Sequence, residues 1–326
     1  MNSFGRIFRI SIFGESHGAS VGVTIDGCPP GIALNEGHLV ADLNRRKSGA
    51  KGTTPRSEAD EPEIISGVFN GYTTGAPITI IFRNTNTISK DYANLVAMPR
   101  PGHADFVAQE KYQGFQDYRG GGHFSGRLTL GIVAAGVVAK KMLSGISITS
   151  QLLSVGGKTD IGSAIDEAVA AHDSLGGIVE CRAAGLPVGW GEPFFDSVES
   201  YISHIVFSIP AIKGIEFGSG FAAAAMRGSE HNDALVNANG QTASNHAGGI
   251  NGGISNGNEL VFRVAVKPTS SIGIGQQTLN RNTGTVEELT IKGRHDACIA
   301  LRVPVVLEAA TAIALADLSL ISRAYR

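Results

Sequence analysis

Four short segments of the sequence combine glycine and histidine with either arginine or a carboxylate. They are GESHG at 14–18, PRPGHAD at 99–105, RGGGHFSGR at 119–127 and GRHDAC at 293–298. Glycine permits positive φ angles and the close approach of other groups, so we expect tight, accessible loops. An ordinary polar turn would explain one such segment. Four of the nine histidines in loops of this kind favour a functional site.

Arginine is concentrated in or near these loops although the chain has a formal net charge of −2. The arginines are Arg45, Arg46, Arg56, Arg100, Arg119, Arg127 and Arg294. A surface salt bridge would explain each one alone, whereas several that converge would bind a small polyanion through paired hydrogen bonds. A bound polyanion would favour protonation of His17, which could then act as a general acid.

Two other interpretations of the same loops stay open at this point. A metal-dependent hydrolase would use zinc or iron, with candidate ligands His17, His103, His123 and either Asp105 or Asp296. The many arginines disfavour a bound cation. A carrier of a phosphorylated ligand would bind that ligand without turnover.

Two segments resemble nucleotide-binding motifs but do not complete them. GGKTD at 156–160 would be the end of a P-loop, but Leu152 stands where the first glycine is needed. GIGQQT at 273–278 ends in Thr278 rather than glycine, and it does not open a predicted helix.

The composition is that of a globular protein, with 42% hydrophobic and 17% charged residues among 326. The small net charge gives no signal for nucleic-acid binding, and no run of about 18 uncharged apolar residues predicts a membrane span. MNSFGRIFRISIF lacks the features of a signal peptide. We therefore expect a cytoplasmic protein that binds neither nucleic acid nor a membrane. Cys28, Cys181 and Cys298 are widely spaced, so we expect reduced thiols.

Apolar patterns predict a mixture of strands and helices that must position these loops. We expect strands at 7–13, 20–26, 77–83, 146–154, 176–184 and 259–266, and helices at 129–144, 161–173, 194–205 and 304–325. The helix at 129–144 is apolar on nearly every side, which indicates burial. The polar segment at 43–63 has no apolar periodicity, and we expect it to be mobile until a ligand binds or to be a solvated linker.

The four motifs, in this order, resemble those of the chorismate synthase family. The resemblance extends through SGVFNGYTTGAPI (66–78), SNHAGGINGGIS (244–255), KPTSSI (267–272) and VPVV (303–306). It implies a lyase that makes chorismate by anti-1,4-elimination of phosphate and a C6 hydrogen from 5-enolpyruvylshikimate 3-phosphate, the last step of the shikimate pathway. The resemblance also implies that reduced FMN is required, although the reaction has no net redox change. The sequence leaves open whether NADPH or an external flavin reductase supplies the reducing power.

The resemblance also implies roles for individual residues. His17 is expected to protonate the departing phosphate, His103 to protonate the reduced flavin, and Asp296 to lie near the flavin N5 and assist loss of the C6 proton. The implied substrate-binding residues are Ser16, Arg46, Arg100, Arg127 and Arg294. The implied flavin-binding residues are His123, Phe124, Ser125, Asn245, Gly252, Lys267, Pro268, Thr269, Ser270, Ser271 and Arg294.

The chain departs from the family pattern in two places. RGGGHFSGR has His123, Phe124 and Gly126 where many members have a form such as RGGGRSSAR, and Lys51 stands near a position that is often arginine. The family fold implied for this chain is α+β, a β-α-β sandwich with helices packed between antiparallel sheets. We expect a single domain over 1–326, assembled as a homotetramer.

Overall fold

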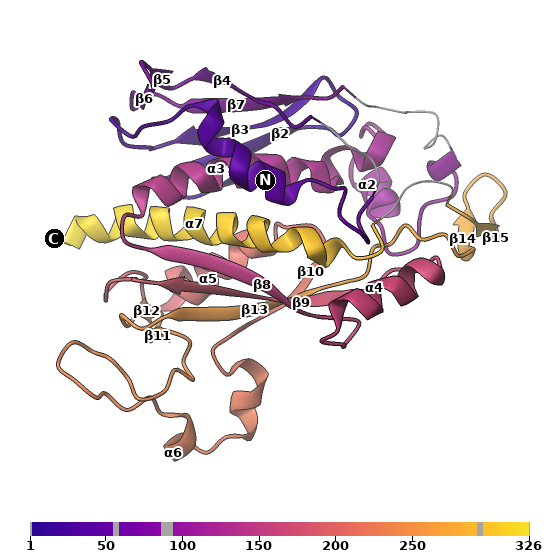
Figure 1. Ribbon diagram of the computed structural model, residues 1–326. Coiled ribbons are helices and arrows are strands. Elements are labelled where there is room, and N and C mark those ends of the chain that lie inside the picture. The colour runs from indigo at the N-terminus through magenta and orange to yellow at the C-terminus, as the bar shows by residue number, and fades with distance from the viewer. Residues whose placement is uncertain (1, 55–58, 86–93, 292–295, 326) are drawn as a thin grey trace.

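Two antiparallel sheets enclose a layer of helices (Figure 1). The computed structural model describes residues 2–54, 59–85, 94–291 and 296–325. The first sheet has the strand order β1 (Ser3–Phe4), β2 (Arg9–Gly14), β3 (Ser20–Asp26), β7 (Ile78–Arg83) and β4 (Pro62–Ser66). The second has the order β10 (Ile212–Phe217), β13 (Leu260–Val266), β9 (Gly177–Ala184) and β8 (Ser147–Val155).

Two apolar helices fill the layer between the sheets. They are α3 (Thr129–Met142) and α7 (Val303–Ser322), which run side by side in Figure 1 and are buried along most of their length. Their close approach depends on Gly136, because a Cβ at this position would lie 2.3 Å from the Cβ of Ala309. The helix α5 (Val198–Val206) packs against α7. The predicted β-α-β sandwich is confirmed.

The strands form because β-branched residues alternate with smaller or polar ones. In β3, Val21, Val23 and Ile25 are fully buried on the helix-facing side, as the two-residue period of a strand requires. β3 pairs with β2 and β7, so the loop after β2 begins from a central part of the sheet. That loop contains GESHG.

The helix α7 has two buried acids that tie it to other parts of the fold. Asp317 accepts hydrogen bonds from the backbone nitrogens of Arg6, Ile7 and Phe8 at 2.6–2.8 Å. Glu308 accepts two from Arg45, at 2.6 and 2.7 Å. The segment Ile299–Tyr325 is long and apolar enough to cross a membrane, but 78% of its most apolar stretch is buried inside this fold.

Each predicted strand and helix is present, with ends that differ by up to four residues. The helix expected to start at 194 begins instead at Val198, after a 3-10 turn over Phe194–Asp196.

The remaining elements are α1 (Val40–Arg46), α2 (Asp105–Lys111), α4 (Ile161–Ala170), α6 (Gly228–His231), β5 (Val68–Phe69), β6 (Tyr72–Thr73), β11 (Ile250–Asn251), β12 (Ile254–Ser255), β14 (Gln276–Asn280) and β15 (Thr285–Leu289).

The polar segment at 43–63 is not loop throughout. Its first four residues complete α1, where Leu43 and Arg46 are buried, and its last two begin β4. The sequence hides this helix because Arg46, although charged, faces the interior. The mobility of the rest of the segment and the single-domain organisation stay predictions, and Arg56 lies outside the described residues.

Candidate active site

The three consecutive glycines of RGGGHFSGR lie beside two of the predicted histidines. Gly120, Gly121 and Gly122 have φ angles of 59°, 81° and 52°, which favour glycine. A Cβ at Gly120 would lie 2.7 Å from His17 Nε2, and one at Gly121 would lie 3.6 Å from His103 Cε1. A Cβ at Gly120 would also lie 2.9 Å from Ser16 Oγ. The loop therefore brings GESHG and PRPGHAD together.

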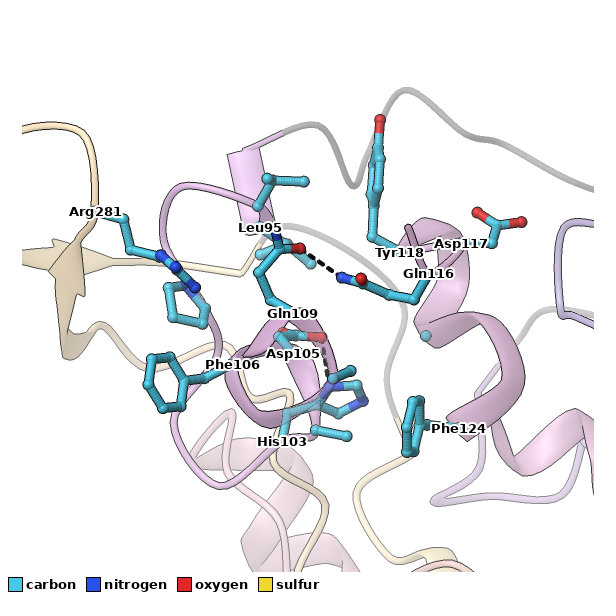
Figure 2. A pocket seen from close by; sticks show the side chains of 15 residues that line it. Leu95, His103, Asp105, Phe106, Gln109, Gln116, Asp117, Tyr118, Phe124 and Arg281 are labelled. Carbon is cyan, nitrogen blue, oxygen red and sulfur yellow. Dashed lines mark hydrogen bonds and ion pairs between the residues drawn. The ribbon is translucent and has the colours of Figure 1, made fainter. Parts of the chain in front are cut away.

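His103 belongs to a hydrogen-bonded group with Asp105 and Arg100. Its Nδ1 lies 2.6 Å from Asp105 Oδ1, an interaction drawn in Figure 2. Arg100 donates two hydrogen bonds to the same carboxylate, from Nε at 2.7 Å and from Nη2 at 2.8 Å. Burial alone would raise the pKa of Asp105, but the hydrogen bonds from Arg100 and His103 outweigh it and hold this pKa well below its usual range. Asp105 thus orients the imidazole through Nδ1 and leaves Nε2 for a ligand.

The same loop is attached to the KPTSS segment. Arg100 Nη1 donates to Ser271 Oγ at 3.1 Å. Lys267 Nζ donates to Ser270 Oγ at 2.7 Å and to the carbonyl of Gly102 at 3.1 Å. These contacts place His103 at a fixed position relative to residues 267–271.

A cavity of about 650 Å³ lies beside this assembly. The predicted site residues that line it are His103, His123, Phe124, Ser125, Lys267, Pro268, Thr269, Ser270 and Ser271. Ile10, Ile12, Leu128 and Ile132 add apolar wall, and Lys213 adds a second lysine. Burial, together with the like charge of Lys213, lowers the pKa of Lys267. An apolar cavity with two lysines suits a partly apolar, anionic ligand.

Arg46 and Arg127 meet behind this cavity at a shared carboxylate. Asp60 Oδ2 accepts a hydrogen bond from Arg46 Nη2 at 2.9 Å, and Asp60 Oδ1 accepts one from Arg127 Nη1 at 2.7 Å. All three residues are buried: Arg46 is 4% exposed, Arg127 is 8% exposed and Asp60 is 6% exposed. The convergence of arginines expected from the sequence is therefore present for this pair.

Hydrogen bonds connect the pair to the loop of His17 and to Arg302. Arg127 Nε donates to Asn84 Oδ1 at 2.5 Å, and Asn84 Nδ2 donates to the carbonyls of Glu15 and Gly18, on either side of His17. On the other side, Arg302 Nε donates to the carbonyl of Arg46 at 2.9 Å.

Asp296 completes this connection. One of its oxygens lies 3.5 Å from Arg302 Nη1, and the other accepts a hydrogen bond from the backbone nitrogen of Thr54 at 2.9 Å. The loop of His17 and the carboxylate of Asp296 are thus linked through Arg127, Asp60 and Arg46.

Some predicted residues do not join these groups. Asn245 bonds to the backbone of Glu259 and Gly249. Gly252 lies in the turn between β11 and β12, at the end of the molecule opposite α2 in Figure 1. Neither lines the cavity within one chain. Arg294 lies outside the described residues, and so does His295.

Two of the residues that depart from the family pattern, His123 and Lys51, have partners in this chain. His123 Nδ1 donates to the carbonyl of Gly14 at 2.9 Å, and its Nε2 lies 3.0 Å from Asn2 Oδ1. His123 therefore holds the N-terminal segment. Because both of its ring nitrogens have partners in the chain, it is a poor candidate for a metal ligand. Lys51 Nζ forms an ion pair of 2.5 Å with Asp166.

Sequence reasoning missed Asp60, Asn84, Arg302 and Lys213, and it considered Asp105 only as a metal ligand. Asp60 lies in an acidic run, SEADEPE, which is typical of a solvated segment. Asn84 follows a strand, where asparagine usually indicates a turn. Lys213 could have been found, because it is the polar member of an alternating strand pattern, IKGIEF.

Comparisons with known proteins agree over nearly the whole chain. A sequence model of the chorismate synthase family matches residues 8–320. The chorismate synthase of Chitinophaga pinensis is 67% identical over 324 residues, which cover 99% of this chain and 98% of that protein. That of Dehalococcoides mccartyi is 48% identical, with 98% and 96% covered. A crystal structure of chorismate synthase matches with a TM-score of 0.74 at 29% identity, over 97% of this chain and 93% of the other.

Proposed function

Because the chain belongs to the chorismate synthase family, the shikimate-pathway lyases, we propose that it converts 5-enolpyruvylshikimate 3-phosphate to chorismate and phosphate with reduced FMN as cofactor. The observation that supports this most strongly is that His17 and His103 lie beside one glycine loop, that His103 lines the cavity, and that the buried Arg46 contacts Gly126 and Thr129 of the cavity wall. The substrate has one phosphate and two carboxylates, which match the cationic character of these residues.

The cavity fits a flavin in size and chemistry. Its volume of about 650 Å³ lies within the usual range for small-molecule sites. Phe124 and the isoleucines offer apolar surface for a ring system, while Lys213, Lys267 and the hydroxyls of Ser270 and Ser271 offer partners for a phosphate or ring edge. When bound, reduced FMN supplies electron density that facilitates cleavage of the allylic C–O bond.

The residues of this chain would assist departure of the phosphate by charge and proton donation. Fixed guanidinium groups stabilise negative charge as it develops on the leaving group, and burial strengthens that interaction. Arg46 and Arg127 are buried and held by Asp60, so little reorganisation is needed. His17, buried against Gly120, would give a proton to the departing oxygen.

His103 and Asp296 have roles on the flavin side of the proposal. Asp105 and Arg100 surround His103 Nδ1, so the exchangeable proton toward a ligand would be at Nε2. Asp296, held by Arg302 and Thr54, would assist removal of the C6 proton.

The proposal includes assembly as a homotetramer. Large side chains that a monomer would normally bury are exposed, notably Phe115, Phe194, Phe195 and Phe221, each at 85% or more. The tetramer would also give Asn245 and Gly252 a route to the cofactor, through a neighbouring copy. Cytoplasmic localisation stays a prediction, and the choice between NADPH and an external flavin reductase is left to the experiment below.

The experiment that tests the proposed reaction measures phosphate release and diene absorbance from 5-enolpyruvylshikimate 3-phosphate without oxygen. Three samples contain reduced FMN, oxidised FMN, or oxidised FMN with NADPH. Turnover with reduced FMN alone supports the lyase with an external reductant, and turnover with NADPH as well adds an intrinsic flavin reductase activity. Folded protein that releases no phosphate with reduced FMN would contradict the proposal.

A further inference from the structure

Asn84 lies at the carboxyl end of a central strand, beside the loop that contains His17. It directly follows β7, which pairs with β3 and β4 and in which Ile80 and Phe82 are fully buried. The backbone nitrogen of Asn84 continues the ladder between β3 and β7 by donating to the carbonyl of Ala19 at 3.1 Å. The strand therefore holds the Asn84 backbone in a fixed position next to that loop.

The side-chain amide of Asn84 has a partner for each of its donors and one for its oxygen. Its Nδ2 donates to the carbonyl of Glu15 at 3.0 Å and to the carbonyl of Gly18 at 2.8 Å. Its Oδ1 accepts from Arg127 Nε at 2.5 Å. Because carbonyls only accept and a guanidinium only donates, these partners define which way the amide points. An aspartate of the same size could keep the contact with Arg127 but could donate to neither carbonyl.

The two carbonyls that Asn84 holds lie on either side of His17 in the sequence. The backbone nitrogen of Gly18 also donates to the carbonyl of Glu15, at 3.0 Å, so residues 15–18 form a tight turn, called here the His17 turn. His17 is buried, with Gly120 beside its imidazole. A shift of the turn would therefore move the imidazole relative to the glycine loop.

Arg127 gives the Asn84 side chain a rigid attachment on its other side. The Arg127 side chain is 7% exposed. Besides its bond to Asn84, it donates from Nη1 to Asp60 Oδ1 at 2.7 Å and from Nη2 to the carbonyl of Arg83 at 3.3 Å. Asn84 thus connects the His17 turn to a buried guanidinium that several contacts hold in place.

We propose that Asn84 is a positioning residue that fixes the His17 turn relative to Arg127, so that the imidazole is in its working position before substrate binds. The inference rests on the proposed function, because His17 is the proton donor of that reaction. Asn84 does not need to touch the reacting atoms. It acts through the carbonyls of Glu15 and Gly18.

The main test is Asn84→Asp, which removes both donor hydrogens and leaves an acceptor for Arg127. A carboxylate oxygen would then face two carbonyls, so the turn should move away from it. We expect amide hydrogen exchange of residues 14–18, measured by mass spectrometry on the ligand-free protein, to be roughly tenfold faster than in the wild type.

The same variant should separate turnover from cofactor binding. We expect kcat, measured by phosphate release with reduced FMN at saturating substrate, to fall by a factor on the order of 10 to 10², because the imidazole is misplaced. The Kd of FMN should stay near its wild-type value, because Asn84 is not among the described residues that line the cavity. A general loss of structure would not spare cofactor binding in this way.

Two further variants identify the cause of these changes. Asn84→Ala removes the same donors without adding a charge, so it should lose kcat and speed exchange to a similar extent. The matched control is Asn258→Asp. Asn258 donates from Nδ2 to the carbonyl of Gly240 at 3.1 Å and accepts at Oδ1 from the backbone nitrogen of Thr242 at 3.2 Å, and it too is absent from the described lining of the cavity. Asn258→Asp should lower the Tm without changing kcat or exchange at 14–18.

Four outcomes would overturn the proposal. They are near-normal kcat in Asn84→Asp, unchanged exchange of residues 14–18 in that variant, an equal loss of kcat in Asn258→Asp, and a loss of kcat in Asn84→Ala alone, which would assign the effect to the contact with Arg127. If Asn84→Asp does not fold, Asn84→Ala is judged by the same measurements. Failure of the proposed function is distinguished by wild-type turnover with reduced FMN, because the exchange measurement needs no ligand.

Discussion

Gly120 allows the sharpest prediction about the site, because it separates contact with His17 from backbone strain. In Gly120→Ala, the new Cβ would lie 2.7 Å from His17 Nε2 and 2.8 Å from its Cδ2, whereas ordinary contact begins at 3.4 Å. The imidazole must therefore move by about 0.7 Å, and a misplacement near 1 Å can cost on the order of 10² in rate. We expect kcat to fall by roughly that factor.

The matched control is Gly157→Ala. Gly157 also has a positive φ, 79°, but no described atom beyond its chain neighbours lies within 4 Å of the position that a Cβ would take. Both variants should lose about 1–2 kcal/mol of stability from the left-handed backbone. Only Gly120→Ala should lose turnover.

The assay is phosphate release with reduced FMN, together with thermal unfolding of both variants. Normal turnover in Gly120→Ala at a lowered Tm would show that the placement of His17 does not limit the reaction. Equal losses of turnover in the two variants would show that general strain, rather than contact with His17, is responsible.

Three more predictions concern single side chains. His17→Ala should cut turnover by a factor on the order of 10²–10⁴ while the Kd of FMN and of substrate, measured by fluorescence, stays nearly unchanged; near-normal turnover would remove His17 from the mechanism. Asp296→Asn should slow turnover while FMN stays bound, and loss of FMN binding would instead indicate a structural role. The pKa of Asp105 is lowered in the folded protein, so its ionised carboxylate stabilises the fold at pH values above the usual aspartate pKa. This contribution to the free energy of unfolding is lost as the pH falls. The stability gap between the wild type and Asp105→Asn, from urea unfolding, should therefore narrow between about pH 5 and 2, and a constant gap would refute the assigned cause.

Much of the architecture could be predicted from local patterns. The buried helices α3 and α7 and the strands β3 and β13 have apolar sequences that admit few other arrangements. The helix α1 was missed because Arg46 interrupts its apolar pattern while lying inside the protein. Its burial depends on Asp60, 14 residues further along, and a pattern of neighbouring residues does not reveal such a pairing.

The site was predictable in its residue types but not in its connections. Glycine and histidine in the same loops indicated His17 and His103, and the structure brings these two to one glycine loop. The sequence does not reveal the roles of Asp60 and Asn84. Both residues bond to Arg127, which lies 67 residues from Asp60 and 43 residues from Asn84, so the contacts exist only in the folded chain.

The measurement that tests the account most directly is a crystal structure of the protein with FMN and 5-enolpyruvylshikimate 3-phosphate bound. We predict the flavin in the cavity lined by Phe124 and residues 267–271, with the phosphate group of the substrate within hydrogen-bond distance of Arg46, Arg127 and His17. A flavin bound elsewhere, or a substrate phosphate far from this pair of arginines, would contradict the central claim that one cavity and one arginine pair form the active site.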